Sequence, residues 1–472
     1  MKSQASVLVG LLWCLALLAI VIIGILHTAS LDLRIVKNQG DAIQAHYLAL
    51  AGIEKAKALL YQDAVNRKRS AKNHTGELYD SPQEFRDVPL GRGEFSVFRQ
   101  GRRTEGGNVI YGLADEESRI NINQASAEEL GKLYGITPDV VAALVDYRDE
   151  DNAVTQGGAE MEYYVSLQPP YLPRNDRFQT LRELLMVRGV ARELLFGEDA
   201  NQNGLLDPEE DDGTESSPPD NHDGILDAGW SGDLTSYSSV LNRSAAGQDR
   251  VNVQLADESS LTQVHGISSD LAKAIIAYRG QNKLESLADL LEVRAMSQPM
   301  QPRPPTPNST PGAASGPAGP AGQPPPLAQP ANTPAPQPQP TGPPLISEEL
   351  LMDIADDLTT LPGSDQPGAI NVNTASPAVL ACLPGISPEL AQAIVSYRQS
   401  AGYLPNVAWL LKVPGMNRQI LKRILPKLSA RSETFRILSE GKVKSTGARK
   451  RIEVVVHLGA VDIDTLSYRE DL

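Results

Sequence analysis

Oxygen-bearing side chains recur at alternate positions between Asp199 and Glu210. They fall at positions one, three, five, nine and twelve of this stretch, with Gly204 at position six and an apolar residue at position eight. That spacing is typical of an EF-hand calcium loop, in which position seven contributes its backbone carbonyl and the last glutamate binds through both oxygens. The predicted calcium ligands are Asp199, Asn201, Asn203, Leu205, Asp207 and Glu210.

A partial second loop follows, so that the two predicted calcium loops together span residues 197–230. Pro219 stands where its first ligand belongs and Trp230 where its last glutamate belongs, which makes Asp220 the candidate for the first position. From residue 198 to residue 233 there are twelve acidic residues and no Lys or Arg, so a cation would relieve charge repulsion. A solvated acidic loop without calcium is the alternative. The predicted ligands of the second loop are Asp220, Asn221, Asp223, Ile225 and Asp227.

The composition limits what else this chain can do. Its 472 residues are too many for one core and predict two or three domains. A formal net charge of −15 argues against a general nucleic-acid surface. Cys14 lies in an apolar stretch far from Cys382, so neither a disulfide nor a cysteine metal site is expected. Metalloprotease, P-loop and nucleophile-elbow motifs are missing from the sequence, which favours a non-enzymatic protein.

The acidic loops must be held by a larger scaffold, which begins with a long helix. Residues 7–26 carry no charge, and twenty residues at 1.5 Å each match the ~30 Å core of a bilayer. Apolar residues then continue at intervals of three and four among charged ones, without proline, up to Tyr61. We therefore predict one helix over residues 6–62, apolar all round in its first half and amphipathic in its second.

Two hairpin patterns lie far apart in the chain. Residues 93–102 and 108–113 alternate around two glycines, and residues 433–442 and 449–457 form the second pair. Because a lone hairpin is barely stable, we expect both hairpins to join one antiparallel sheet against the long helix. The sheet would then consist of residues 63–117 and 428–472, and everything between them would be an insertion.

The insertion contains a threefold repeat. Each copy opens with an Asn between two apolar residues, reaches a Gly-Ile turn fifteen residues later, and has a Tyr-Arg pair after it. A Ser or Thr caps the helix after each turn, which predicts helix-hairpin-helix units. Residues 150–178 interrupt copy one as a surface loop. The openings are residues 120–123, 251–254 and 370–373, the turns begin at Gly135, Gly266 and Gly385, and the arginines are Arg148, Arg279 and Arg398.

Helix-hairpin-helix units often bind the DNA backbone, and this activity has to be weighed here. A DNA-binding turn presents backbone amides to a phosphate at the start of the following helix. In this chain an acid follows each turn at that place, namely Asp139, Asp270 and Glu389, and it would repel a phosphate. The sequence therefore predicts no nucleic-acid binding.

A proline-rich tract divides the insertion. Residues 299–344 hold 18 of the 35 prolines and predict an extended linker without a core of its own. On this interpretation, residues 118–298 form an inserted helical domain that contains two repeats and the calcium loops. Residues 345–427 would form a separate helix-hairpin-helix repeat beyond the linker.

These features together resemble the type IV pilin-like proteins. Residues 1–5 correspond to a leader, and the cut would fall between Ala5 and Ser6. Gly10 stands where most members carry a glutamate, which is similar to the K-type minor pseudopilins of the type II secretion system. Further likeness lies in residues 115–126, 369–398 and 451–460. The resemblance implies an α+β fold: a pilin-like long N-terminal helix packed on a small antiparallel sheet, with a large inserted α-helical domain of helix-hairpin-helix (SAM-like) repeats.

The resemblance also implies a function. It predicts a non-enzymatic subunit at the tip of the pseudopilus, which helps to start fibre assembly and protein export across the outer membrane. Implied partners are the I- and J-type minor pseudopilins, the pseudopilus, the prepilin peptidase and the inner membrane, with one span and most of the chain in the periplasm. Neighbouring subunits would contact the helix between Ile35 and Leu60. The alternative is a membrane-anchored helix-hairpin-helix DNA receptor of a competence system.

Overall fold

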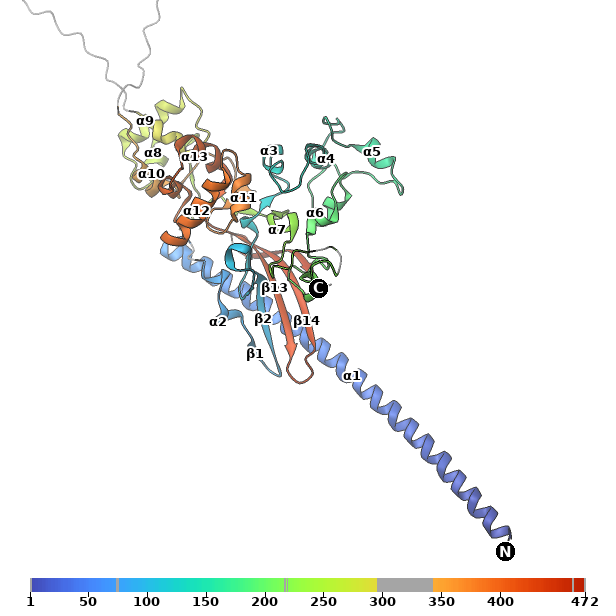
Figure 1. Ribbon diagram of the computed structural model, residues 1–472. Helices are drawn as coiled ribbons and strands as arrows, with labels where there is room; N and C mark the ends of the chain where they lie inside the picture. Colours follow the sequence, from blue (N-terminus) through green and yellow to red (C-terminus); the bar gives the residue numbers. More distant parts are fainter. Residues whose placement is uncertain are drawn as a thin grey trace, which may run out of the picture.

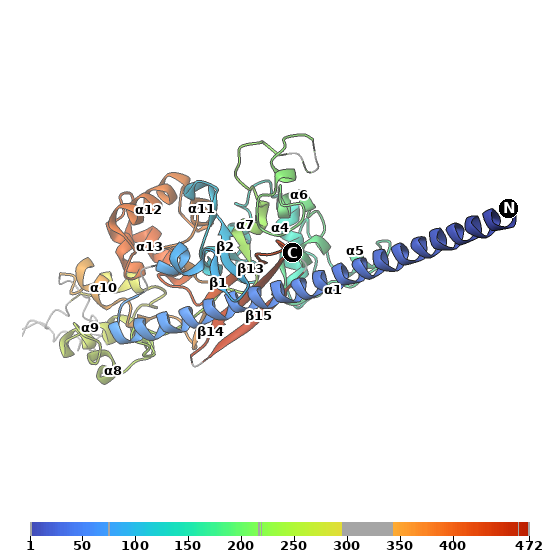
Figure 2. The same cartoon turned by 90° about the horizontal axis from the view of Figure 1, so that it is seen from below.

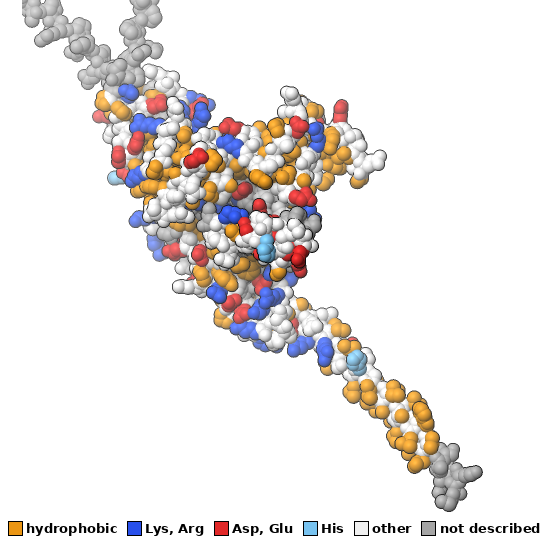
Figure 3. All heavy atoms as spheres, in the orientation of Figure 1, with side chains coloured by type: hydrophobic (Ala, Val, Ile, Leu, Met, Phe, Trp, Pro, Cys, Tyr) orange, Lys and Arg blue, Asp and Glu red, His pale blue; other side chains and the backbone are white. Residues whose placement is uncertain are grey.

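The structure is a computed structural model that describes residues 2–73, 76–215, 218, 220–294, 343–460 and 462–470. It begins with α1 (Lys2–Ser70), whose first half projects from the rest of the molecule (Figure 1). Its exposed apolar side chains make this the helix that could cross a membrane by length and composition (Figure 3). The predicted processing site at Ala5 and Ser6 lies in this helix, but the side chains of residues 2–7 are outside the described part.

The helix is longer than the sequence pattern predicted. It continues eight residues beyond residue 62, to Ser70. Arg67, Lys68 and Arg69 occupy the last turn, where cations interact favourably with the negative end of the helix dipole. These basic residues extend the helix past the last apolar residue of the amphipathic pattern.

One antiparallel sheet packs against the second half of α1 (Figure 2). The order is β1-β2-β13-β14-β15, with β3 beside β2 and β4 beside β13. Residues 93–100 and 434–443 pair directly, so the two hairpins join one sheet as predicted. The strands β1, β4 and β15 were not predicted. The bounds are β1 (Val88–Leu90), β2 (Gly93–Gln100), β3 (Val109–Ile110), β4 (Ala114–Asp115), β13 (Thr434–Val443), β14 (Arg449–Leu458) and β15 (Ile463–Arg469).

Small residues let α1 lie very close to the sheet. Ala45 and Ala49 are completely buried beneath it. A Cβ atom on Gly441 of β13 would lie 2.1 Å from the Ala45 carbonyl oxygen and 2.5 Å from the Ala49 nitrogen. A Cβ on Gly52 would meet the Ser439 hydroxyl at 2.2 Å. The helix and strand backbones are therefore in contact at a place where only glycine fits.

The insertion consists of three copies of one unit, and each copy is closed by a short parallel ladder. The opening strands β5, β8 and β11 pair with β6, β9 and β12, respectively. The Asn of each opening strand bonds back across its ladder: Asn121 to the Ser238 carbonyl at 3.0 Å, Asn252 to the Leu361 carbonyl at 3.0 Å. The closing strands were not predicted, because each has only two residues, too few to show an alternation of apolar and polar side chains.

The elements of the copies have the following bounds. Copy one contains β5 (Ile120–Asn121), α3 (Ala127–Leu130), α4 (Pro138–Arg148), α5 (Met161–Val165), η4 (Leu181–Met186), α6 (Arg192–Phe196), α7 (Gly229–Asp233) and β6 (Leu234–Thr235). Copy two contains β8 (Val251–Asn252), α8 (Glu258–Thr262), α9 (Ser269–Arg279), η6 (Leu287–Glu292), α10 (Glu348–Ile354) and β9 (Leu358–Thr359). Copy three contains β11 (Ile370–Asn371), α11 (Pro377–Cys382), α12 (Pro388–Ala401), η7 (Val407–Lys412), α13 (Arg418–Ile424) and β12 (Leu428–Ser429).

The predicted domain boundary at the proline-rich tract is wrong. Val251 of β8 pairs with Leu358 of β9, so copy two begins before the tract and ends after it. Arg294 and Pro344 form an isolated bridge, and the Leu345 N–H donates to the Val293 carbonyl at 2.9 Å. Residues 295–342 lie outside the described part of the chain, and the described residues on either side of them meet at this bridge. The tract is therefore an insertion within one repeat.

One apolar core runs through all three copies. Buried residues from Ile120 to Ala430 belong to a single cluster, which includes residues on both sides of the tract. Lys132 of copy one donates to the Ala381 and Leu383 carbonyls of copy three, at 3.2 and 2.7 Å. Residues 118–298 and 345–427 thus form one helical domain, which lies at the end of the sheet away from the projecting half of α1 (Figure 1).

Candidate metal centre

The first predicted calcium loop folds around its own carboxylates. Asp199 accepts hydrogen bonds from the N–H groups of Asn203 and Gly204, each at 3.0 Å. Glu210 accepts from the N–H groups of Asn201 and Asp207, each at 3.2 Å. The first and last ligands of the predicted loop are therefore tied to its middle by backbone hydrogen bonds.

The side chains of this loop form a partly buried group of oxygens. Asp199 is 4% exposed, Asn203 6% and Glu210 4%. The Asn201 and Asn203 side-chain amides both donate to Asp207 Oδ2, at 2.8 and 2.7 Å. Burial and then the nearby charge of Glu210 raise the pKa of Asp199 to about 6, and backbone hydrogen bonds oppose this only in part. Carboxylate and amide oxygens on a buried loop suit a hard cation such as calcium.

The loop lies directly against the pilin sheet. Leu205, at the position that would offer a carbonyl, buries its side chain beside Phe98 of β2 and Leu438 of β13. The Leu206 N–H donates to Gln100 Oε1 at 3.3 Å, and Arg469 of β15 donates to the Gln202 carbonyl at 3.3 Å. The order of the loop is therefore coupled to three strands of the sheet.

Near the second predicted loop, one predicted ligand lies beside two residues that we did not predict. Asp211, Asp220 and His222 bring ligand atoms within 4.8 Å of one another. Asp211 accepts the Gly224 N–H at 3.2 Å, whereas Asp223 pairs with Arg103 at 2.9 Å. Asp211 and His222 were not predicted, because they occupy no ligand position of the repeated pattern.

The other predicted ligands of the second loop serve its own turns. Asn221 accepts the Asp223 N–H at 3.0 Å, and Asp223 accepts the Ile225 N–H at 2.9 Å. Asp227 accepts the Gly229 N–H at 3.2 Å. Because Arg103 neutralises the charge of Asp223, the acids of the second loop repel one another less than they would without it, and a cation would stabilise this loop less.

The helix-hairpin-helix turns have the predicted form. Gly135, Gly266 and Gly385 have φ of 68°, 91° and 82°, a region that favours glycine. The side chains of Thr137, Ser268 and Ser387 accept hydrogen bonds from the third residue of the next helix, at 3.4, 3.2 and 3.3 Å. The acids after the turns, Asp139, Asp270 and Glu389, are all exposed at the helix starts.

The repeated arginine has a structural partner in each copy. Arg279 donates to the Val253 carbonyl and Arg398 to the Val372 carbonyl, each at 2.7 Å. Arg148 donates to the Ala125 carbonyl at 2.5 Å and also to the Ile122 carbonyl. These contacts tie the second helix of each unit to its opening strand, which explains the constant spacing without a ligand.

Comparison with known proteins shows which family parts of this chain resemble. Residues 110–196 match the family described as "Type II secretion system (T2SS), protein K", and residues 247–299 and 366–429 match the helix-hairpin-helix motif. The chain is 29% identical over 156 residues to type II secretion system protein K of Klebsiella pneumoniae, a match that covers 32% of this chain and 47% of that protein. The chain is therefore similar to the type II secretion K proteins, most specifically within residues 110–196.

Two further comparisons gave similar proteins. The endonuclease/exonuclease/phosphatase family domain-containing protein 1 of Rattus norvegicus is 27% identical over 192 residues, which cover 40% of this chain and 28% of that protein. A chain of the crystal structure of the GspK-GspI-GspJ complex from enterotoxigenic Escherichia coli covers 92% of this chain and 98% of its own length, at 12% identity and a TM-score of 0.39. The match to the Klebsiella protein spans about half, 47%, of that protein's length.

A buried ionic cluster joins the sheet to the helical domain. The chain passes from the sheet into the helical domain at residues 115–119 and returns to the sheet at residues 431–436, and the cluster is formed by these two stretches. Arg436 Nε donates to Glu116 Oε1 at 2.8 Å, and Arg119 pairs with the same oxygen at 3.4 Å. The Thr235 hydroxyl of copy one also donates to Glu116. Although burial opposes it, the charges of Arg436 and Arg119 lower the pKa of Glu116 to about 2.

Two other acids of this junction connect the same parts. Asp115 Oδ2 accepts from the Ser432 hydroxyl at 2.6 Å and from the Asn371 amide of copy three at 3.2 Å. Glu117 accepts the N–H groups of Thr434, at 3.0 Å, and of Ser239. Burial and the nearby Asp115 raise the pKa of Glu117 well above its ordinary value. The sequence showed these acids only as part of a family likeness, and their role as a joint required the structure.

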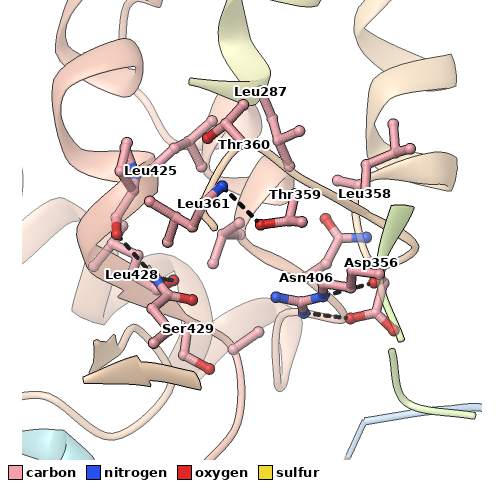
Figure 4. A pocket seen from close by; sticks show the side chains of 16 residues that line it. Leu287, Asp356, Leu358, Thr359, Thr360, Leu361, Asn406, Leu425, Leu428 and Ser429 are labelled. Carbon is pink, nitrogen blue, oxygen red and sulfur yellow. Dashed lines mark hydrogen bonds and ion pairs between the residues drawn. The ribbon is translucent and has the colours of Figure 1, made fainter. Parts of the chain in front are cut away.

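A pocket lies where copies two and three meet (Figure 4). Its labelled apolar walls are Leu287 and Leu358 of copy two and Leu425 and Leu428 of copy three. Arg250 pairs with Asp356 at 3.0 Å, and the Asn406 amide donates to the Met352 carbonyl at 2.6 Å. The described residues that line the pocket include neither His nor Cys, so they supply no nucleophile–base pair of the usual kinds. The Asn406 hydrogen bond joins copy three to copy two, whereas Arg250 and Asp356 both belong to copy two.

Proposed function

We propose that this chain is a non-enzymatic minor pseudopilin at the tip of a type II secretion pseudopilus, where it helps to start fibre assembly and protein export across the outer membrane. The observation that carries the proposal is the placement of the helical domain. It covers the end of the sheet opposite the projecting, membrane-compatible half of α1 (Figures 1 and 3). A subunit stacked beyond that end would collide with this domain.

Gly10 supports the same position. In a helical fibre of pilin-like subunits, a buried positive amino terminus needs an acidic partner, because an isolated charge in low dielectric costs several kcal/mol. Gly10 supplies no such acid, and α1 has no acid before Asp32. This suits a subunit with no neighbour beyond it. Removal of the leader between Ala5 and Ser6 by a prepilin peptidase belongs to the proposal, and an intact mass that includes Met1 would contradict it.

The surface proposed to contact other pseudopilins is smaller than predicted. Ile53 and Leu60 are 2% and 1% exposed because they pack on the chain's own sheet. Ile35, Ile43 and Tyr47 are 54%, 60% and 66% exposed and remain available. We propose that this exposed part of α1 contacts the I- and J-type minor pseudopilins, with the apolar first half held in the inner membrane and the bulk of the chain in the periplasm.

Photocrosslinking of the full chain in its native membrane tests this function. A photoreactive amino acid in place of Tyr47 should crosslink to the I- and J-type subunits, and the same residue in place of Tyr134 should not. Tyr134 is a matched control, since it is 90% exposed but lies on the helical domain. Crosslinks of the Tyr47 variant to major subunits at regular intervals along the fibre would contradict a tip position.

The DNA-receptor alternative is less well supported. The acids at the three turns are exposed, and the repeated arginines are bound to backbone carbonyls. Neither arrangement provides the phosphate contacts on which nucleic-acid affinity depends. We infer that the chain does not bind DNA. Salt-sensitive binding of duplex DNA by the full chain near ~100 mM salt, at about micromolar affinity or tighter, would reinstate the receptor function.

We also propose that residues 197–230 bind calcium, and the first loop gives the sharper prediction. Glu210→Ala should abolish calcium binding at this loop, with affinity in the wild type of about 10⁻⁴ to 10⁻³ M as in extracellular modules. Calcium at tenfold this range should stabilise the wild type by about 1.4 kcal/mol through mass action. Calorimetric titration and thermal unfolding measure both effects. The control is Glu209→Ala, because Glu209 is exposed beside Glu210. Equal calcium heats from wild type and Glu210→Ala would eliminate the site.

A further inference from the structure

A small cavity lies where the end of α1, the sheet and the helical domain meet. Its volume is about 20 Å³, which is enough for one species of about the size of a water molecule. The walls come from residues within 64–68 of α1, from the loop of residues 241–247 at the end of β7 (Ser239–Leu241), and from residues within 431–433 and 458–460 of the sheet region. The cavity therefore touches both the pilin-like part of the chain and the insertion.

Positive charge predominates in the walls of this cavity. Four cationic side chains line it, against the one acid Glu433: Arg67, Lys68, Arg243 and Arg431. Arg67 and Arg431 both pair with Glu433 Oε1, at 3.5 and 3.4 Å. The Arg67 side chain is 9% exposed and that of Arg431 is 2% exposed, so one carboxylate is shared between two buried guanidinium groups. A buried charge is costly unless it is fully paired.

Two buried donors in the walls lack an acceptor within the described part of the chain. Arg431 Nη2 donates to the Leu241 carbonyl at 2.8 Å, but Arg431 Nη1 is buried without a hydrogen-bond partner. The Ser244 hydroxyl is in the same condition, on a residue that is 4% exposed. Native structures almost always supply a partner to such groups. Because both residues line the same cavity, one acceptor placed there would serve both donors.

The neighbouring acceptors are already engaged. Glu433 Oε2 accepts the Leu241 N–H, and the Ala460 carbonyl accepts Lys68 Nζ at 3.4 Å. Asp249 pairs with Arg243 Nε at 2.9 Å. A water molecule would satisfy the unpaired donors and leave the excess positive charge in place. An anion would satisfy the donors and offset the charge, and its attraction to them is stronger in the low dielectric of a protein interior than in water.

The charges around Arg431 agree with this need. Burial lowers the pKa of Arg431 to about 10, and the positive charges of Arg250 and Arg67 act in the same direction, whereas Glu433 opposes them. The loop is also fitted to Lys68. Gly247 has a φ of 78°, and a Cβ atom there would lie 3.1 Å from Lys68 Cγ, so the loop packs on the apolar stem of this lysine.

We propose that this cavity binds one small inorganic anion of the size of chloride, held by Arg431, Ser244 and Lys68. The volume of about 20 Å³ admits a single-atom ion and excludes sulfate and phosphate. The bound ion would connect α1 to the loop that follows β7, and so would fasten the pilin-like part to the insertion at a second place besides the Glu116 junction. The site does not depend on the position of the subunit in a fibre.

Thermal unfolding of the full, detergent-solubilised chain tests the site. The chain is compared in sodium chloride and in sodium gluconate of equal ionic strength, because gluconate is too large for the cavity. At about ten times its Kd, chloride should raise the unfolding temperature of the wild type by about 2–4 °C, and the rise should saturate. If water fills the cavity instead, the two salts should give no saturable difference, and this result would overturn the proposal.

Two substitutions distinguish binding from a general effect of salt. Ser244→Ala and Lys68→Gln should each reduce the rise in chloride. Arg69→Gln is the matched control for Lys68→Gln, because Arg69 is an exposed cation in the same turn that does not line the cavity. In gluconate, Ser244→Ala should be at least as stable as the wild type, since it removes an unpaired buried hydroxyl. Equal chloride effects in the wild type and in Ser244→Ala and Lys68→Gln would also refute the site.

Bromide provides a direct readout that needs no variant. Bromide carries the same charge as chloride and is only slightly larger, and its anomalous scattering identifies it. Crystals of the full chain grown in sodium bromide should show one anomalous peak between Arg431 and Ser244. A water molecule at this place, without anomalous signal, would overturn the proposal.

Discussion

Glu116→Gln should lower the free energy of unfolding of this chain by about 3–5 kcal/mol, the usual cost of breaking one side of a buried ion pair. Glu116 is completely buried and pairs with Arg436 at 2.8 Å, so the substitution would leave that guanidinium with less negative charge beside it. Chemical denaturation of the full chain in detergent measures the loss. Glu54→Gln is the control, because Glu54 makes an exposed ion pair with Lys57 and should change stability by less than about 1 kcal/mol.

The same substitution should change how stability depends on pH. The pKa of Glu116 is about 2 in the folded chain and 4.5 ordinarily, so its ionised form is favoured by folding. Its stabilisation is complete above pH 4.5 and is lost as the pH falls toward 2, which amounts to about 3 kcal/mol. Glu116→Gln should therefore lose less stability than the wild type between these pH values. If the free energy of unfolding falls equally for the two proteins between pH 4.5 and pH 2, this account of the junction is contradicted.

Gly441→Ala should destabilise the chain by about 1–3 kcal/mol or more, as overpacking does in a tight interior. The added methyl group would stand 2.1 Å from a backbone oxygen and 2.5 Å from a backbone nitrogen of α1, and neither can rotate away. The helix would have to move off β13, which also changes the direction in which its apolar half leaves the sheet. Denaturation measures the stability loss, and reduced crosslinking from position 47 measures the change of direction.

The control for this prediction lies on α1, the helix that Gly441 contacts. A Cβ atom on Gly40 would have no neighbour within 4 Å. Gly40→Ala should therefore stabilise the chain slightly, by up to about 1 kcal/mol, because alanine favours helix more than glycine does. Opposite signs for the two glycine substitutions are expected, and equal losses would show that contact with the sheet is not the cause.

The spacing of apolar residues along the chain correctly predicted the long helix and the longer strands of the sheet. The long helix and the strands β2, β13 and β14 alternate clearly, and their apolar faces meet as expected. The repeat of glycine turns located the three hairpins correctly. In contrast, β15 is mostly exposed and has no such alternation, so the sequence did not indicate it.

The parts that were missed depend on contacts between distant residues. The last helix of copy two, α10, lies beyond the proline-rich tract, and the pairing of Val251 with Leu358 shows which copy it completes. The EF-hand-like spacing placed Asp199 and Glu210 correctly in one loop, since the pattern is short and lies within one stretch of the chain. Glu116 and Arg436 lie in distant parts of the sequence, and only the folded chain brings them together.

The bridge between Arg294 and Pro344 makes this position suitable for protein engineering. Since the two ends of the tract already lie side by side, the length of the segment between them affects stability only through loop-closure entropy, about 0.6 kcal/mol for each doubling. A fluorescent protein or an affinity tag in place of residues 295–342 should therefore leave the three-copy core intact. Such a reporter would extend from the helical domain, beyond the end of the sheet, and would mark the position of this subunit in an assembled secretion apparatus.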